Sequence, residues 1–403
     1  MKKVISLALV SAMAVSMVAC AGKAQNVETT AAATTAAATT AAPAATEAPK
    51  AEETKAEESK AEETTAAAAE EKTPEAENQE IMDFILAPSD NPDKVLIKYT
   101  DQAADLFGQS YLRGNREFLR ILKEELGDKI QIEYYPNGTL GNSVEALVGG
   151  LQTDTFQMMD YAIGSYASYT NAFQPLDIPY LVTSSDDAFE QLNGKAGEIM
   201  GAKLTADTGI MPIFYNIIGM RQMTNSKRPI KTPEDLKGLK LRTQSNSIQM
   251  DGLAAFGCSI QSIPFTELFT ALQQGVVDGQ ENPIETIYAY QFADVQKYLS
   301  LTNHLCGANA VVCSQAWYDK QSDEVKAAIA KAAEGAIAYS KTEFDASQDE
   351  TLEELKKIIE VNELSAEDLA AFQEVAKTAW PKLAEDIGAD YVNEVLAALG
   401  LSM

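Results

Sequence analysis

The chain has 403 residues, with 59 acidic side chains against 32 basic ones and a net charge of -27. This balance excludes a nucleic-acid-binding protein, because binding to the phosphate backbone needs clustered lysine and arginine. Hydrophobic residues make up 46% of the chain, which is enough for one or two sizeable cores and argues against global disorder.

The N-terminus predicts export and lipid attachment. Lys2 and Lys3 precede an apolar run over residues 4–18, which is shorter than the roughly 20 residues of a membrane span. The Met-Val-Ala-Cys sequence that ends at Cys20 resembles the lipobox of bacterial lipoproteins. We therefore expect a signal peptide over residues 1–19, lipidation of Cys20, and anchoring to the outer face of the bacterial cytoplasmic membrane. An ordinary signal peptide is the alternative.

Residues 20–85 predict a disordered tether behind this anchor. From 21 to 80 the chain is built almost wholly from Ala, Thr, Glu, Lys and Pro, including KAEETKAEESKAEET at 50–64. Such a segment cannot bury apolar surface, and its like charges keep it extended.

Motifs of catalysis and metal binding are missing from the sequence. His304 is the only histidine, no P-loop or G-x-S-x-G occurs, and Cys258, Cys306 and Cys313 follow no metal spacing. We therefore expect no enzyme, no cofactor and no metal site. An odd number of cysteines after Cys20 gives no disulfide framework and predicts buried free thiols.

Strands and helices alternate from about residue 92. The segments 95–100 and 130–135 predict strands on either side of a helix over 108–126. A short helix over 142–152 and the strand FQMMDYAI over 156–163 follow. This βαβαβ order predicts a parallel sheet.

A helix predicted over 186–206 and a strand predicted over 210–217 extend the same layer. Thr232 then caps a short helix, and the strand that carries Arg242 starts the next unit. A long helical pattern covers 321 to about 358.

These units predict an α/β protein of two lobes with a ligand cleft between them. Ligands on open α/β sheets bind beyond the carboxyl ends of the strands, and we place Arg242 and the DGQENP loop (278–283) at such ends. The expected bounds are 92–217 with about 309–347 for lobe I, and 218–308 with about 348–403 for lobe II.

Arg242 is the leading candidate for a binding residue. In KGLKLRTQ we place it on the inward face of a short strand with Leu239 and Leu241. A buried guanidinium persists only with an anionic partner or a dense set of hydrogen bonds. Two partners fit: the anionic group of a ligand, or an internal acid such as Glu281.

Several longer motifs resemble one family. NSKRPIKTPEDLKGLKLRT, IPFTELFTALQQGVVDGQENPIETIY and DVQKYLSLTNH look like the extracytoplasmic solute-binding subunit of tripartite ATP-independent periplasmic (TRAP) transporters, in its dicarboxylate-binding branch. The likeness covers about 95–350 and is densest over 219–304. It implies a two-lobed periplasmic-binding-protein-like fold with a long helix spanning both lobes. It also implies delivery of a small organic acid to the small and large membrane subunits of a permease.

The resemblance assigns roles to individual residues. Arg242 matches the arginine that pairs with the ligand carboxylate, Arg221 a second basic contact, Asn282 an amide bound to the same carboxylate, and Phe265 an aromatic wall. Ser245 completes the candidate set. From the residues alone, Arg221 also fits a solvated loop, Asn282 a helix cap, and Phe265 plain core.

The contacts from lobe I stay open. Ser143, Val144 and Ala162 depart from the residues that relatives place there, and Tyr161 or Tyr166 is expected to close the pocket. A monocarboxylate, a dicarboxylate and a sugar acid all fit. We expect a monomer, and an ABC-type or sensory ligand-binding lipoprotein is the alternative function.

Overall fold

The computed structural model describes residues 73–403. The predicted signal peptide, Cys20 and the tether up to residue 72 lie outside this range. The predicted C-terminal end of the tether is wrong, because Pro74–Ile85 form helix α1. Thr73 caps its N-terminus, and Ile81, Met82 and Ile85 contribute to a hydrophobic cluster with α2. Apolar side chains at this spacing share one face of a helix, and packing overrides the polar composition.

The first sheet has the predicted parallel core. Strands β1 (Val95–Thr100), β2 (Ile130–Tyr135) and β3 (Met158–Ala162) are parallel in the order β2-β1-β3. Strand β9 (Cys306–Ser314) adds to β3 in the antiparallel direction. Helices α2 (Ser110–Leu126) and α3 (Val144–Gln152) are the predicted crossovers between the parallel strands.

Strand β4 (Ile210–Asn225) belongs to two sheets. Its residues 210–220 pair with β9, and its residues 221–225 pair with β7 and β8. The prediction ended this strand at residue 217. A register shift at Gly219, whose φ is 120°, replaces the expected break, because glycine adopts such a backbone angle without a steric penalty.

The second sheet is mixed. Its order continues from β4 through β7 and β5 to β6, and β8 with β10 extends from β4 on a separate path. The bounds are Lys240–Thr243 for β5, Ser259–Ser262 for β6, Gly279–Pro283 for β7, Tyr298–Leu301 for β8 and Glu360–Glu363 for β10. Strand β7 corrects the predicted DGQENP loop, and β10 was not predicted.

Helices cover both sheets. The helix predicted over 186–206 is two helices that are separated at Asn193. There the Asn193 side chain donates a hydrogen bond to the carbonyl of Tyr215 and accepts one from its backbone N–H. The α-helices not yet given are α4 (Ser185–Leu192), α5 (Lys195–Thr208), α6 (Ser247–Ala254), α7 (Leu268–Gln273), α8 (Ile284–Ala289), α9 (Gln315–Asp319), α11 (Ala366–Lys377), α12 (Trp380–Ile387) and α13 (Ala389–Ala398). The short 3-10 turns are Gly127–Lys129, Ile163–Ser168, Gln174–Asp177, Pro233–Leu236, Phe265–Glu267 and Phe292–Val295.

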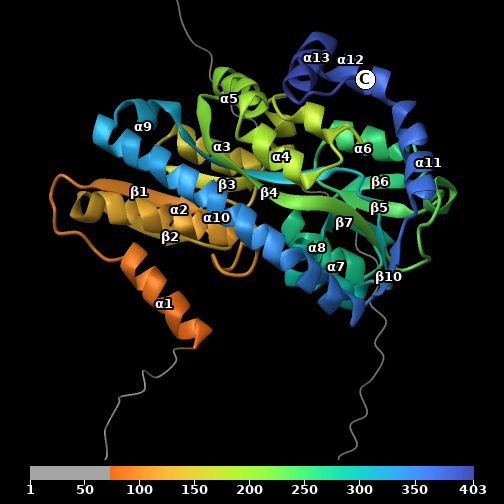
Figure 1. Ribbon diagram of the computed structural model, residues 1–403, viewed down its shortest axis with the longest axis horizontal. Coiled ribbons are helices and arrows are strands. Elements are labelled where there is room, and N and C mark those ends of the chain that lie inside the picture. The colour runs from red at the N-terminus through yellow and green to blue at the C-terminus, as the bar shows by residue number, and fades with distance from the viewer. Residues whose placement is uncertain (1–72) are drawn as a thin grey trace, which may run out of the picture. The chain divides into compact units, whose positions relative to one another are not determined.

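The predicted long helix is α10 (Asp323–Lys356), which the Ser322 side chain caps. It packs on α2 beside the first sheet and on α8 beside the second. Figure 1 shows it crossing β4 on its way from α9 to β10. The helix thus spans both halves, and the predicted α/β, two-lobed fold class is confirmed.

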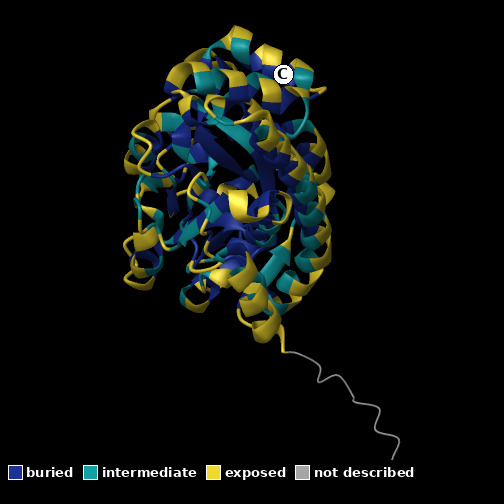
Figure 2. Cartoon of the chain, turned by 90° about the vertical axis from the view of Figure 1, so that its left-hand side faces the viewer, coloured by how far each residue is buried: buried dark blue, intermediate teal, exposed yellow. Residues whose placement is uncertain are grey.

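Each sheet separates two hydrophobic clusters. Val311 and Val312 are neighbours on β9 but pack in different clusters, as the alternation of a strand requires. Figure 2 shows the buried strands inside, with exposed residues on the outer helices. Cys258, Cys306 and Cys313 are free thiols, as predicted. Within residues 73–403, no helix has the length and apolar character that crossing a membrane requires.

Candidate ligand-binding site

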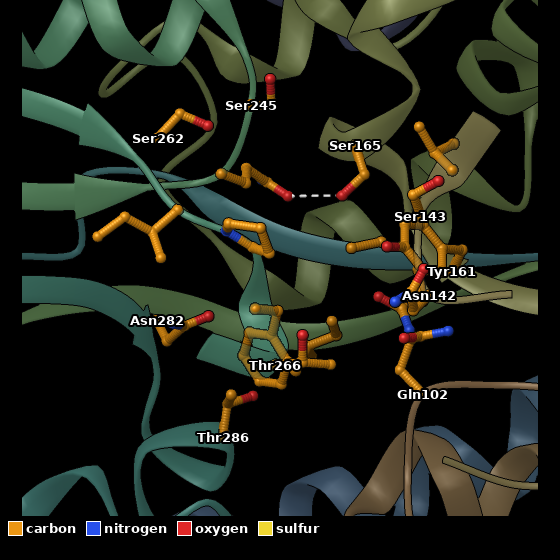
Figure 3. Close-up of a pocket in the computed structure, with 18 of the residues that line it drawn as sticks. Gln102, Asn142, Ser143, Tyr161, Ser165, Ser245, Ser262, Thr266, Asn282 and Thr286 are labelled. Atoms are coloured by element: carbon orange, nitrogen blue, oxygen red, sulfur yellow. Dashed lines mark hydrogen bonds between the residues drawn. The ribbon is translucent and has the colours of Figure 1, made fainter. Parts of the chain in front are cut away.

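A pocket of about 360 Å³ lies between the two sheets, within the range of small-molecule sites. Gln102, Asn142 and Tyr161 gather on one side of it, and Ser262, Asn282 and Thr286 lie on the other (Figure 3). All five predicted binding residues line this one pocket: Arg221, Arg242, Ser245, Phe265 and Asn282.

Arg242 is buried in the pocket wall with 3% of its surface exposed. Its Nε donates a hydrogen bond to the carbonyl of Ile263 at 2.9 Å. Among residues 73–403, no acidic side chain forms an ion pair with it, so the alternative of a direct Arg242–Glu281 pair is wrong. Burial lowers the pKa of Arg242 to about 10, and the more distant charge of Glu281 acts against that change.

The predicted face of Arg242 also needs correction. Leu239 and Leu241 pack in a hydrophobic cluster of the second sheet, whereas Arg242 lines the pocket. Successive residues of a strand point to opposite faces, so Arg242 cannot share the face of Leu241. Both faces of β5 are buried, which is why burial of Arg242 was nevertheless predicted correctly.

Arg221 is the arginine that pairs with Glu281. Its Nε bonds the Glu281 carboxylate, and its Nη2 donates to Oε1 of the same carboxylate at 3.0 Å. Nη2 also donates to the Glu281 carbonyl at 2.7 Å and to Oδ1 of Asn282 at 3.0 Å. Arg221 therefore lies in a buried strand, not in a solvated loop. Within the described part of the chain, its Nη1 makes no hydrogen bond.

The surroundings of Glu281 favour its ionised form. Burial alone acts to raise its pKa, but the charge and hydrogen bonds of Arg221, with His304, hold the pKa well below its usual range. Thr243 on the neighbouring strand β5 adds a hydrogen bond to Oε1 at 2.7 Å. The ring of His304 is buried, and its Nδ1 lies 2.8 Å from Oγ1 of Thr302. The single histidine is therefore a buried residue that is held by its neighbours.

Asn282 is held by its own strand. Its Nδ2 donates to Oε1 of Gln280 at 2.5 Å, while its Oδ1 accepts from Arg221. Helix α8 begins two residues later, at Ile284, without any side-chain cap at Pro283. The alternative of a capping asparagine is therefore wrong, and the amide is fixed at the pocket wall.

Phe265 is both a wall and part of a core. Its ring centroid lies 6.0 Å from Cζ of Arg242, a distance at which a guanidinium attracts an aromatic face. The same ring makes edge contacts with Tyr290 at 4.7 Å and Phe292 at 5.9 Å between centroids. Ser245 lies in the exposed turn between β5 and α6, at the edge of the pocket.

The first-sheet wall holds a residue that the sequence reasoning missed. Asp160 on β3 is 2% exposed and lines the pocket. Its Oδ2 accepts from Nδ2 of Asn309 on β9 at 2.6 Å. Burial raises the pKa of Asp160 to about 7, against the effects of hydrogen bonds from Asn309 and Asn115. A single acid inside the apolar run FQMMDYAI is the signal that the sequence offered.

Two further first-sheet residues were predicted as alternatives. Tyr161 lines the pocket, whereas Tyr166 is buried in a hydrophobic cluster and does not line it. Ser143 and Val144 at the start of α3, with Ala162 at the end of β3, are also at the pocket. The end of β3 and the start of α3 thus form part of this wall.

Hydrogen bonds join the two walls beside the pocket. Oγ of Ser165 donates to Oε1 of Gln244 at 2.9 Å, the dashed line of Figure 3. Next to it, Asn246 and Gln249 of α6 donate to the two carboxylate oxygens of Asp177 at 2.6 and 2.7 Å. Burial raises the pKa of Asp177 to about 7, although both hydrogen bonds oppose this.

The arrangement is suited to holding an anion. The buried guanidinium of Arg242 lines a pocket that also has hydroxyl and amide groups in its walls, and guanidinium groups match carboxylates with two parallel hydrogen bonds. Among residues 73–403, no group of three or more His, Cys, Asp or Glu side chains is placed to hold a metal ion.

A shared strand, a crossing helix and a polar pocket between two sheets define a two-lobed extracytoplasmic solute-binding protein. The chain belongs to the bacterial extracellular solute-binding protein family 7, whose sequence profile matches residues 108–386. This family provides the solute-binding subunits of TRAP transporters and not enzymes, as the motifs predicted.

Two curated relatives have recorded ligands. The 2,3-diketo-L-gulonate-binding periplasmic protein of Escherichia coli is 31% identical over 242 residues, which cover 60% of this chain and 73% of that protein. The C4-dicarboxylate-binding periplasmic protein of Rhodobacter capsulatus is 29% identical over 289 residues, which cover 71% and 86%.

Solved structures agree with the fold. The sugar-acid-binding protein of Advenella mimigardefordensis, in complex with galactonate, has a TM-score of 0.72 and 29% identity over 77% of this chain and 99% of that one. A TRAP solute-binding protein of Sulfurospirillum deleyianum, with bound succinate, has a TM-score of 0.69 and 26% identity over 75% and 98%.

Proposed function

We propose that this protein captures a small organic acid outside the cytoplasmic membrane and delivers it to the two membrane subunits of a TRAP permease. Family membership supports this function and separates the chain from ABC-type binding proteins. Relatives bind a diketo sugar acid and C4-dicarboxylates, and solved neighbours hold galactonate and succinate. The ligand is therefore a carboxylate.

The observation that carries the proposal is the environment of Arg242. Its guanidinium is buried and lines the pocket, and within the described part of the chain one carbonyl is its hydrogen-bond partner. Removing a charge from water is costly unless an opposite charge or further hydrogen bonds replace the water. The carboxylate of the ligand supplies both, and exclusion of water strengthens the pair.

The other candidate residues have supporting roles in this proposal. Nη1 of Arg221 and the amide of Asn282 contact the same carboxylate, Phe265 forms one wall, and Ser245 contributes a hydroxyl group at the pocket edge. Their places around one pocket support these roles.

The cellular setting follows from the N-terminus. We propose that Cys20 carries the lipid anchor, that the following segment is a spacer, and that the protein works as a monomer. We also propose the lobe bounds expected from the sequence, with β4 and α10 shared between the lobes. The exception is the C-terminal pair α12 and α13, which packs in the hydrophobic cluster of the first sheet, where α13 contacts α5. Replacement of Cys20 by serine should release the protein from the membrane fraction, whereas Cys258→Ser should leave it there.

Calorimetric titration with organic acids tests the function. A thermal-shift screen selects the acids, since a ligand that binds only the folded state raises Tm. The wild-type protein should bind one of them, and Arg242→Ala should abolish that binding with an unchanged circular dichroism spectrum. Arg120→Ala is the matched control, because Arg120 pairs with Glu117 and Glu124 on the surface of α2. Undiminished affinity of Arg242→Ala would refute the proposal.

A further inference from the structure

Glu285 is a buried acid that lies beside the pocket without lining it. It belongs to the first turn of α8, and 4% of its surface is exposed. The ion pairs found among residues 73–403 do not include it. A carboxylate that is removed from water costs free energy unless other groups replace the water. The partners of Glu285 should therefore explain why an acid is buried at this position.

These partners come from two other helices. Oε2 of Glu285 accepts a hydrogen bond from the backbone N–H of Ser110 at 3.1 Å and another from the Ser110 hydroxyl at 2.7 Å. Ser110 is the first residue of α2, which packs beside the first sheet. Oε1 of Glu285 accepts from the hydroxyl of Ser347 on α10. One carboxylate thus joins α8 of the second half to α2 of the first half and to the helix that spans both.

Helix α2 depends on this contact because its own sequence leaves its N-terminus uncapped. Gln109 stands at the N-cap position but makes no side-chain hydrogen bond there, and the first turn contains no acid. The first N–H groups of a helix have no partner within the helix, and a negative charge near them is stabilising. Glu285 supplies both the acceptor and the charge from a position 175 residues away.

The residues next to this contact line the pocket. Tyr111 follows Ser110 on α2 and is part of the lining. Thr286 follows Glu285 on α8 and is also part of it (Figure 3). A further hydrogen bond joins the same helix starts, because Oγ1 of Thr286 donates to Oε1 of Gln109 at 3.1 Å. The spacing between these two parts of the lining therefore depends on how the starts of α2 and α8 are held together.

The contact lies at the level where β4 passes from one sheet to the other. Gly219 marks the register shift of β4, and α10 lies close to it. A β-carbon at residue 219 would be 3.2 Å from the ring of Phe344 and 3.6 Å from Oε1 of Gln348. Ser347 stands between these two residues in the chain. Glu285 thus ties α2 and α8 to the part of α10 beside which the shared strand changes sheets.

We infer that Glu285 is a positioning residue of the ligand site. Its carboxylate fixes the start of α8 against the start of α2 and so sets the spacing between Thr286 and Tyr111 across the pocket. A site that is loosened by a fraction of an ångström loses much of its affinity, because hydrogen bonds weaken steeply away from their best geometry. This inference rests on the proposed function and adds a residue behind the wall of the same site.

Calorimetric titration of the full chain tests it, with D-galactonate, D-erythronate and succinate as the first probes. Each variant is titrated about 20 °C or more below its own Tm, where almost all of the protein is folded and a loss of stability alone does not change the affinity. Glu285→Ala removes the contacts with both serines and should weaken binding of the tightest wild-type ligand by about tenfold or more. Glu285→Gln keeps an acceptor oxygen for Ser110 and should bind within about twofold of the wild-type protein.

Asp368→Ala is the matched control. Oδ2 of Asp368 also accepts hydrogen bonds from the backbone N–H and the hydroxyl of one serine, Ser365, at 3.2 and 2.7 Å. This pair caps α11 and lies outside the pocket lining, so its loss should lower Tm and leave the affinity unchanged. Should Glu285→Ala fail to fold, Ser347→Ala takes its place. It removes only the contact with α10 and should weaken binding by about threefold.

The outcomes separate the failure of this inference from that of the proposed function. Undiminished affinity of Glu285→Ala, or of Ser347→Ala in its place, would overturn the positioning role while the proposed function stands. An equal loss of affinity in Glu285→Gln would also overturn it, because charge rather than hydrogen-bonded position would then matter. So would an equal loss in Asp368→Ala, which would make the effect one of general stability. Binding of none of the three probes, nor of any acid in the wider screen, would overturn both.

Discussion

Two arginines that line one pocket have opposite environments. Arg221 on β4 reaches across to β7 and finds Glu281, Asn282 and a carbonyl, so its charge and most of its donors are satisfied by the protein. Arg242 on β5 is equally buried but, among residues 73–403, has a single carbonyl as its hydrogen-bond partner. In the proposed function, the first environment positions Arg221 within the site, and the second leaves the guanidinium of Arg242 to pair with the ligand carboxylate.

The difference shows that burial alone does not identify a binding residue. A buried charge is informative when its hydrogen bonds are counted, because each missing partner has to be supplied from outside or costs free energy. By that count Arg242 is the arginine of the pocket that most needs a partner from outside the protein.

The largest effect should come from breaking the ion pair between Arg221 and Glu281. Glu281→Gln leaves the buried charge of Arg221 uncompensated, and we expect the free energy of unfolding to fall by about 3–5 kcal/mol. Chemical denaturation measures this change. Glu117→Gln removes one partner of the surface ion pairs of Arg120 and should cost less than about 1 kcal/mol. Equal losses of unfolding free energy in Glu281→Gln and Glu117→Gln would contradict the prediction that the buried ion pair matters more than the surface one.

Lysine in place of each arginine should separate binding from stability. Arg242→Lys keeps the charge but loses the planar fork, so ligand binding should weaken by about 2 kcal/mol with little change in Tm. Arg221→Lys loses the bidentate contact with Glu281, so its main effect should be a lower Tm. Calorimetry and thermal unfolding of both variants check this. A drop in Tm for Arg242→Lys alone would mean that Arg242, and not Arg221, is the arginine needed for stability.

The acids of the pocket region should make stability depend on pH. Burial raises the pKa of Asp160 and Asp177 from 3.8 to about 7, so the folded state binds more protons than the unfolded state between these values. Their contribution to stability is therefore greatest below pH 3.8 and is lost as the pH rises to about 7. Glu281 has a lowered pKa and acts in the opposite sense at acidic pH.

Tm values at pH 5 and pH 8 measure the effect of Asp160. The wild-type Tm should drop over this interval, and Asp160→Asn should reduce the drop by about 2–4 °C, since its side chain does not ionise. Asp154→Asn, which makes the same chemical change outside the pocket lining, should show the wild-type drop. An equal drop in Asp160→Asn would mean that Asp160 ionises freely in the folded protein.

The smallest effect should come from the aromatic wall. Phe265→Leu keeps most of the apolar contact but removes the ring face near Arg242, and should weaken binding by about 0.5–1 kcal/mol. Phe292→Leu is the matched control, because Phe292 contacts Phe265 and lies outside the pocket lining. It should lower Tm and leave the affinity unchanged. A loss of affinity only in Phe292→Leu would remove the role of Phe265.

Local patterns predicted the α/β order, the parallel start of the first sheet and the length of α10. They failed where distant segments decide the structure. DGQENP contains turn-forming residues, yet it forms β7 because Gln280 bonds Thr224 and Glu281 bonds Arg221 on β4. Which arginine pairs with Glu281 depends on the register of β7 against β4 and β5, which no single segment specifies.

The candidate site was predicted on one side only. The family motifs lie mostly in the second sheet and identified Arg221, Arg242 and Asn282, all of which line the pocket. Asp160 lies between apolar residues that predict a buried strand, and its partner Asn309 is far away in the sequence. Only the pairing of β3 with β9 brings the two together.

Strand β4 limits how the pocket can open. Because one unbroken chain segment is hydrogen-bonded into both sheets, the halves cannot slide past each other or separate without losing backbone pairing. Any change in the angle between the halves would have to bend this strand, whose ladder already shifts register at Gly219, and the long helix α10. Entry and release then strain a few backbone torsions while both cores stay packed, which suits a receptor that must load and unload many times.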